Sequence, residues 1–164
     1  MTIFGLQSRS ICSRRLIGVL ISQKNQCSNV IFSSSFLPII SMTQHKKHVL
    51  VAEDEAFLLS MMRSILSKHG LRVSTAQNGQ EAIDVMTKDL PDLLFLDLLM
   101  PQVDGYAVLK HRKEKNMKFP VVVCSNLRDK ASIEKCAEFN VNEYLIKSDM
   151  DDDQIWIIAE KYLT

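Results

Sequence analysis

Side chains that can do chemistry follow four apolar runs of the sequence. Glu53 and Asp54 come after "HVLVA", Asp97 after "LLFL", Ser125 after "VVVC" and Lys147 after "EYLI". Carboxylates that lie close together repel one another, which raises the pKa of one of them unless a cation lies between them. Oxygen ligands with room for water suit magnesium. If the fold gathers these positions, the sequence predicts a magnesium site with a hydroxyl and an ammonium group beside it.

Asp97 is unusual because it lies inside an apolar run, "LLFLDLLMP" at residues 93–101. Burying an unpaired carboxylate costs several kcal/mol or more, so a residue in this position requires a cation, a cage of hydrogen bonds or a function. We expect the apolar run to form a buried strand. Asp97 is then expected to be the exposed end of that strand, compensated by the metal ion.

Short apolar runs alternate with amphipathic stretches from His48 to the end of the chain. Most of the runs are continuously apolar, which is typical of parallel strands buried on both faces. The stretches between them have the apolar spacing of helices. This alternation predicts a doubly wound α/β fold, whose ligands bind beyond the carboxyl ends of the strands. Strands are expected at residues 48–52, 71–76, 92–97, 120–125 and 143–147, and helices at 56–70, 78–90, 104–114, 129–139 and 151–163.

Composition places the chain among globular proteins, because 46% of its 164 residues are hydrophobic and 24% are charged. The net charge of +1 hides an asymmetry. Residues 1–42 contain four basic residues and no acidic one, which leaves −3 for residues 43–164. This mildly acidic part has no excess of positive charge for binding nucleic acid phosphates.

Residues 1–45 are expected to form a basic, Ser-rich extension without stable structure, and several hypotheses can explain it. Enrichment in Arg and Ser without acids is typical of an organelle transit peptide. A secretory or twin-arginine signal fits poorly, because the apolar stretch at residues 16–21 is too short. Alternatively, the native start is Met42.

Cys124 is expected to be a small core residue, and the four cysteines have no metal-binding spacing. A cytoplasmic, reducing location is therefore predicted, with organelle targeting left open.

Taken together, the motifs resemble the receiver domain of two-component response regulators, stand-alone and similar to chemotaxis regulators. The matching stretches are "VLVAEDE", "PDLLFLDLLMPQVDG", "PVVVCSN" and "NEYLIKS", and the resemblance spans residues 46–163. It implies a five-stranded parallel sheet, doubly wound as (βα)5, with the flavodoxin-like strand order 2-1-3-4-5. Residues 46–164 would form the receiver domain.

By this resemblance Asp97 is the phosphoacceptor of a magnesium-dependent reaction, and a histidine kinase or a histidine phosphotransfer protein is the donor. Glu53 and Asp54 would bind the metal together with Asp97 and the backbone carbonyl of Leu99. Such a site suits phosphoryl transfer, which asks a protein mainly for positioning and for positive charge around the developing oxygens.

The resemblance also implies roles for the remaining site residues. Ser125 would hydrogen-bond the phosphoryl group, Lys147 would pair with it, and Tyr144 would turn inward when Ser125 moves; a plain edge aromatic is the other interpretation of Tyr144.

Because the chain ends at Thr164, directly after the fifth helix, we expect no fused output domain. The expected output is phosphorylation-dependent binding of an effector protein by a signalling module, not an enzyme, with no direct nucleic acid or membrane partner.

The sequence departs from the family pattern at several positions, and the mildest change is Ser125 in place of the commoner threonine, which keeps the hydroxyl. Ser148 follows Lys147 where proline is usual, which leaves the geometry of the lysine open. Asn126 replaces a small residue and could crowd the phosphoryl group. Leu99 and Leu127 flank the path of an attacking water and cannot orient it, so we predict slow autodephosphorylation.

Three alternative hypotheses belong to other classes. A receiver-like docking module that works without phosphorylation is compatible with the departures at Ser148 and Asn126. A phosphatase of the haloacid dehalogenase type requires a second Asp two residues after the nucleophile, where Leu99 stands. A nucleotide- or flavin-binding domain lacks a Gly-rich loop, because "AEDEAF" at residues 52–57 would repel a phosphate.

Overall fold

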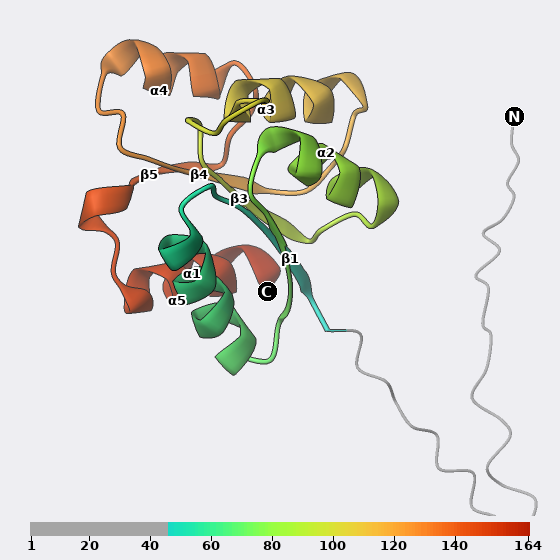
Figure 1. The fold of residues 1–164 in the computed structure, drawn as a ribbon, viewed down its shortest axis with the longest axis vertical. Helices are drawn as coiled ribbons and strands as arrows, with labels where there is room; N and C mark the ends of the chain where they lie inside the picture. Colours follow the sequence, from blue (N-terminus) through green and yellow to red (C-terminus); the bar gives the residue numbers. More distant parts are fainter. Residues whose placement is uncertain (1–45) are drawn as a thin grey trace, which may run out of the picture. The chain divides into compact units, whose positions relative to one another are not determined.

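A parallel sheet of five strands forms the centre of the fold, with the order β2-β1-β3-β4-β5 (Figure 1). The structure is a computed structural model and describes residues 46–164, so the predicted extension at residues 1–45 lies outside it. The predicted (βα)5 fold and strand order are confirmed. The strands are β1 (His48–Ala52), β2 (Arg72–Ala76), β3 (Leu93–Leu96), β4 (Val121–Ser125) and β5 (Glu143–Ile146).

Helices cover both faces of the sheet (Figure 1). On one face α1 and α5 pack side by side, and α2, α3 and α4 cover the other. The helices are α1 (Ala56–Lys68), α2 (Gly79–Lys88), α3 (Gly105–Glu114), α4 (Lys130–Ala137) and α5 (Asp152–Leu163), and a short 3-10 helix, η1 (Lys147–Asp149), follows β5.

Two hydrophobic layers hold these helices against the sheet, because successive side chains of each strand point to opposite faces. Every residue of β1, β3 and β4 is buried, as their continuous apolar sequences predict. The edge strands β2 and β5 are only partly buried. Cys124 has the predicted core position, with a free thiol that is 2% exposed.

Four of the five helices have a side-chain cap at their N-terminus, and each cap defines the residue at which the helix begins. The side chain of Asn78 accepts from the Glu81 amide at the start of α2. Asp104, Asp129 and Asp151 cap α3, α4 and α5 in the same way. Each cap satisfies an amide that the helix itself leaves without a partner.

Several predicted boundaries were wrong by one or two residues; α2 and α4, for example, end at Lys88 and Ala137 rather than at residues 90 and 139. The first helix ends at Lys68 rather than at residue 70, because Gly70 adopts a left-handed φ of 82° that a helix cannot continue. Strand β5 ends at Ile146, so Lys147 starts the 3-10 helix instead of ending the strand.

Within residues 46–164, every helix is too short or too polar to cross a lipid bilayer.

Candidate functional site

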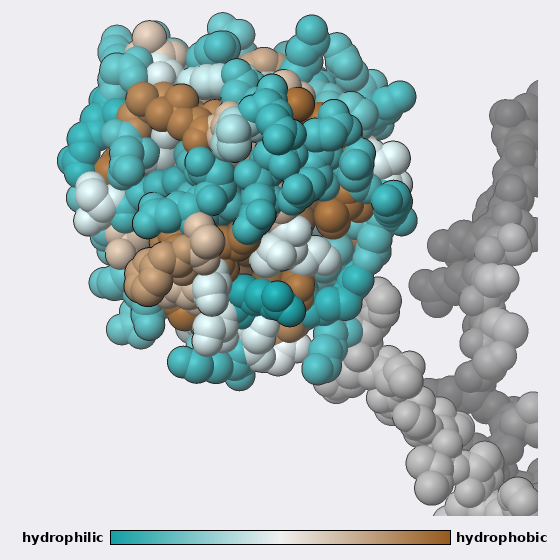
Figure 2. Space-filling view, in the orientation of Figure 1, coloured by the Kyte–Doolittle hydropathy of each residue, from teal (hydrophilic) through white to brown (hydrophobic). Residues whose placement is uncertain are grey.

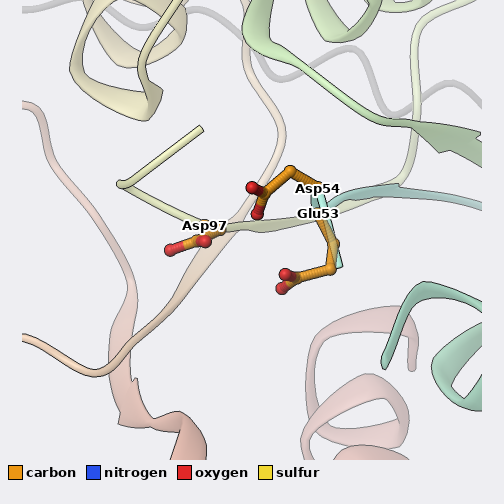
Figure 3. Close-up of side chains that lie close together, drawn as sticks. All are labelled: Glu53, Asp54 and Asp97. Atoms are coloured by element: carbon orange, nitrogen blue, oxygen red, sulfur yellow. The ribbon is translucent and has the colours of Figure 1, made fainter. Parts of the chain in front are cut away.

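Three carboxylates and one ammonium group meet where β1, β3 and β5 end. One carboxylate oxygen from each of Glu53, Asp54 and Asp97 lies within 4.8 Å of the other two, and Figure 3 shows these side chains side by side. The Lys147 Nζ lies 2.7 Å from Glu53 Oε2 and 2.6 Å from Asp97 Oδ2. The structure thus brings together these four predicted residues, which are far apart in the sequence.

Asp97 is buried, and the prediction that it would be an exposed strand end was wrong. It is only 4% exposed, and Glu53 is 1% exposed, whereas Asp54 is exposed. The reason is that Lys147 supplies the compensating charge from inside the protein, so Asp97 does not need water as its partner. An amide hydrogen bond from Leu99 to Asp97 Oδ1, 3.2 Å long, adds to this compensation.

Backbone contacts hold the two acidic strand ends in register. The Asp97 amide donates to the Ala52 carbonyl, and the Glu53 amide donates to the Ala76 carbonyl, both at 2.9 Å. Gly105 lets the first turn of α3 pack directly on the backbone of Asp97. A Cβ atom at position 105 would lie 2.2 Å from the Asp97 carbonyl oxygen, so any larger residue would displace the loop that carries Asp97.

Burial and charge pull the pKa values in this cluster in opposite directions. Burial raises the pKa of Glu53 above its usual range, although the hydrogen bond from Lys147 works against the rise. Burial alone would lower the pKa of Lys147, but its hydrogen bonds to Asp97 and Glu53 raise it overall. With one ammonium for three carboxylates, the charge of the cluster is incompletely neutralised, and its hard oxygen donors fit a divalent cation such as magnesium.

Ser125 and Tyr144 meet at the loop that follows β4. Ser125 is fully buried, and its Oγ accepts from the Leu127 amide at 3.3 Å. The Tyr144 hydroxyl donates to the Leu127 carbonyl at 2.8 Å, and its ring packs against the core layer under α2, α3 and α4. Burial raises the pKa of the Tyr144 hydroxyl. Both side chains therefore hold the same loop residue, Leu127.

Comparison with known proteins agrees with this geometry. The model of the response regulator receiver domain family matches residues 49–158, about two thirds of the chain. The chain belongs to this family.

Curated relatives of this receiver domain differ in length. The chain is 28% identical over 100 residues to the chemotaxis protein CheY of Bacillus subtilis (strain 168), a match that covers 60% of the chain and 83% of CheY. It is 33% identical over 103 residues to the probable transcriptional regulator ycf27 of Guillardia theta, which covers 62% of the chain. That match spans only 40% of the ycf27 protein.

Solved receiver structures have the same fold. The Francisella response regulator 1452 receiver domain superposes with a TM-score of 0.66 at 25% identity, and the match covers 71% of this chain and 96% of that one. A CheY-like receiver domain protein from Methanospirillum hungatei JF-1 has a TM-score of 0.65 at 19% identity, covering 71% and 94%. The second likeness shows the fold alone.

The departure at Ser148 has a structural counterpart in this receiver domain. Lys147 reaches the carboxylates from the first position of η1, and the Met150 amide closes that turn on the Lys147 carbonyl at 3.2 Å. Arg128 bridges to this turn, with Nη2 at 2.7 Å from Ser148 Oγ and 2.8 Å from Asp149 Oδ1. Sequence reasoning missed Arg128, because nothing in its neighbours signals a contact with a loop 20 residues away.

The predicted apolar flanks differ in their exposure. Leu99 is 58% exposed, while Leu127 is partly buried and packs against the core layer under α2, α3 and α4. Asn126 is exposed to solvent.

Proposed function

We propose that this protein is a response regulator in which Asp97 accepts a phosphoryl group from a histidine kinase or a histidine phosphotransfer protein. The observation that carries the proposal is the convergence of Lys147 on Asp97 and Glu53 at the carboxyl edge of the sheet. Structural ion pairs are normally balanced, whereas this cluster retains an excess of negative charge. Excess carboxylate in a buried position is expensive to keep, which supports a functional role.

Glu53, Asp54 and Asp97 are the residues that would hold magnesium, together with the Leu99 backbone carbonyl. Their carboxylates lie within mutual reach of one small cation, and their oxygen atoms match its preference. When bound, magnesium would supply positive charge to the phosphoryl oxygens during transfer. Asp54, as the exposed member of the group, faces the solvent from which the cation arrives.

In the transfer step a carboxylate oxygen of Asp97 forms a bond to phosphorus. The bond between phosphorus and the donor's histidine nitrogen breaks, and that nitrogen keeps the electron pair. Lys147 already lies 2.6 Å from Asp97 Oδ2, so its ammonium is positioned to pair with the added phosphoryl oxygens. Ser125 Oγ would donate to one of these oxygens.

The signal would travel through Leu127. If Ser125 moves toward a phosphoryl oxygen to donate to it, the hydrogen bond that its Oγ accepts from the Leu127 amide would pull on that amide or break. The Tyr144 hydroxyl holds the carbonyl of the same residue, so loop and ring would shift together. We propose that an effector protein recognises this rearranged surface, and that the protein works in the cytoplasm without binding nucleic acid directly.

Acetyl phosphate with magnesium tests the proposal, with intact mass as the measurement. The wild type should gain one phosphoryl group, and Asp97→Asn should gain none. Asp92→Asn is the matched control, because Asp92 precedes the same strand at its opposite end, and this variant should be phosphorylated like the wild type. No adduct on the wild type, together with no magnesium binding, would support the alternative of a docking module that works without phosphorylation.

A further inference from the structure

The amino-terminal edge of the sheet carries an apolar hollow of about 480 Å³. It lies between the end of α2 and the segment that joins α3 to β4, and its apolar lining includes Leu90, Met117 and Phe119. We call it the α2–α3 hollow. The Leu90 side chain is 61% exposed, so it offers a partner most of its apolar surface. A second hollow of about 490 Å³ shares residues 116–119 with the first.

Positive charge gathers beside this hollow although residues 43–164 are acidic overall. The stretch from 106 to 120 contains five Lys and Arg residues and a single acid, Glu114, which pairs with Lys110. Lys115 and Lys118 line the hollow and are exposed. Neither forms an ion pair with any residue between 46 and 164. The hollow therefore combines an apolar lining with two ammonium groups that form no ion pair within residues 46–164.

The walls of the hollow are held in place before any partner arrives. The Asn116 amide donates to the Lys113 carbonyl and the Met117 amide to the Arg112 carbonyl, at 3.1 and 3.0 Å, while Asn116 has a left-handed φ of 51°. This pattern is a Schellman motif, which ends a helix in one defined conformation. The Arg112 guanidinium donates to the carbonyls of Phe119 and Phe139, and these hydrogen bonds hold the segment before β4 and the segment after α4 in place.

We propose that the α2–α3 hollow binds an acidic peptide segment of another protein. A Leu, Phe or Met side chain of that segment would enter the hollow against Leu90 and Met117. Its carboxylates would pair with Lys115 and Lys118 at the rim. A preformed apolar site flanked by unpaired charges of one sign gives both anchoring and specificity, because a peptide of the wrong charge is repelled.

Charge argues against two other occupants of the hollow. The basic segment at residues 1–42 has four positive charges and no acid, so Lys115 and Lys118 would repel it. A nucleic acid would place a long row of phosphates along residues 43–164, whose net charge of −3 repels them. A short peptide contacts only the rim of the hollow.

Binding at this hollow is independent of phosphorylation. The hollow lies where β3 and β4 begin, whereas Asp97 and Ser125 stand at the far ends of these strands. An acidic partner can therefore remain bound while the phosphoryl group is added and removed. Such a contact would tether the receiver to a kinase complex or a scaffold.

Selection from a phage-displayed library of random twelve-residue peptides on the full-length chain tests this inference. Recovered peptides should combine Asp or Glu with Leu, Phe or Met. Their affinity should fall by about ten-fold in Lys115→Glu/Lys118→Glu and in Leu90→Ser, which both change exposed side chains. Arg63→Glu/Lys68→Glu is the matched control, because it makes the same charge change on exposed positions of α1 and should bind as the wild type does.

Asp97→Asn separates this inference from the proposed function, because the variant should bind the peptides within about two-fold of the wild type. Equal binding to the wild type and Lys115→Glu/Lys118→Glu would overturn the inference. Two further results would also overturn it: charge-dependent binding of a labelled DNA duplex with no peptide recovered, or a dimer in light scattering that Lys115→Glu/Lys118→Glu abolishes. The first would assign the patch to nucleic acid, and the second to another copy of this chain.

Discussion

The two edges of the sheet differ in how far their charged groups are paired. At the carboxyl edge, Glu53, Asp54 and Asp97 share one ammonium group, so negative charge is left over. At the amino-terminal edge, outside the rim of the α2–α3 hollow, several charged groups pair with one another or with backbone groups. Arg72 pairs with Asp89 there.

His48 is the buried member of the paired groups at the amino-terminal edge. Its backbone amide donates to Asp92 Oδ2 at 2.7 Å, and its Nε2 lies 2.8 Å from Ser74 Oγ. Asp89 lies 3.8 Å from its Nδ1. In the layer under α2, α3 and α4, the Arg112 guanidinium donates hydrogen bonds to the backbone carbonyls of Phe119 and Phe139.

The two edges therefore contribute different properties to the protein. A balanced set of charges lowers the energy of one fixed structure and has nothing left to offer a ligand. An unbalanced set costs stability in the free protein and recovers that cost when a cation or a phosphoryl group with its counter-ions arrives. Substitutions of the paired groups at the amino-terminal edge should therefore change stability, and those at the carboxyl edge should change chemistry.

Arg112→Met should have the largest effect on stability. It removes three guanidinium hydrogen bonds, which leaves the partly buried carbonyls of Phe119 and Phe139 without these donors. We expect the free energy of unfolding in urea to fall by about 3 kcal/mol. Lys113→Met is the neighbouring control and should cost less than about 0.5 kcal/mol, because Lys113 is exposed.

Arg112→Met also tests whether the two edges are coupled. Under conditions where Arg112→Met remains folded, acetyl phosphate should modify it as fast as the wild type. A large loss of phosphorylation in the folded variant would mean that the two edges are coupled.

Magnesium should stabilise the carboxyl edge. At a concentration roughly ten times its dissociation constant, the cation should raise the free energy of unfolding by about 1.4 kcal/mol over the value in EDTA. Asp54→Asn should lose most of this gain, because it removes the exposed ligand without disturbing the pair of Lys147 with Asp97. An equal gain in the wild type and the variant would place magnesium elsewhere.

His48 should make the amino-terminal edge sensitive to mild acid. Burial lowers the pKa of His48 below 6.5, and the charge of Arg72 lowers it further, although Asp89 and Asp92 oppose the change. As pH falls below 6.5, the unfolded chain binds a proton that the folded chain does not. Stability is therefore lost over this window, by no more than about 1.4 kcal/mol per pH unit.

Urea unfolding between pH 7 and pH 5 checks this prediction against His48→Gln. The stability of the wild type should decline relative to the variant as the pH falls. The difference between the two proteins is the informative quantity, because the raised pKa of Glu53 makes that residue favour the folded state in acid. Parallel curves for the two proteins would show that His48 takes up its proton equally well in both states.

The sequence predicts the carboxyl edge well because strand ends determine it. Each continuous apolar run predicts one buried parallel strand, and the residue that follows a strand must lie at the common edge. Glu53, Asp54, Asp97 and Lys147 could therefore be placed together before any contact was known. The convergence follows from topology, which local pattern reveals.

Other features depend on contacts between loops, and local pattern does not reveal them. The burial of Asp97 results from the reach of Lys147, which in turn depends on the 3-10 turn after β5. Arg128 contacts that turn from another loop, and Arg112 reaches carbonyls of two separate segments. In both cases a long side chain selects its partner only after the sheet has formed.

Leu99→Asn tests the finest distinction, between residues that hold the phosphoryl group and residues that affect its removal. Leu99 is 58% exposed beside Asp97, and its side chain cannot orient a water for attack on phosphorus. An amide at this position could do so. We expect Leu99→Asn to shorten the phosphorylated lifetime by about three-fold, equivalent to about 0.6 kcal/mol, in a decay followed by intact mass after removal of acetyl phosphate. Leu90→Asn is the matched control, because Leu90 is similarly exposed at the opposite edge and should leave the lifetime unchanged. A wild-type lifetime no longer than that of Leu99→Asn would mean that side chains other than Leu99 control the water, and the apolar flank would lose its role.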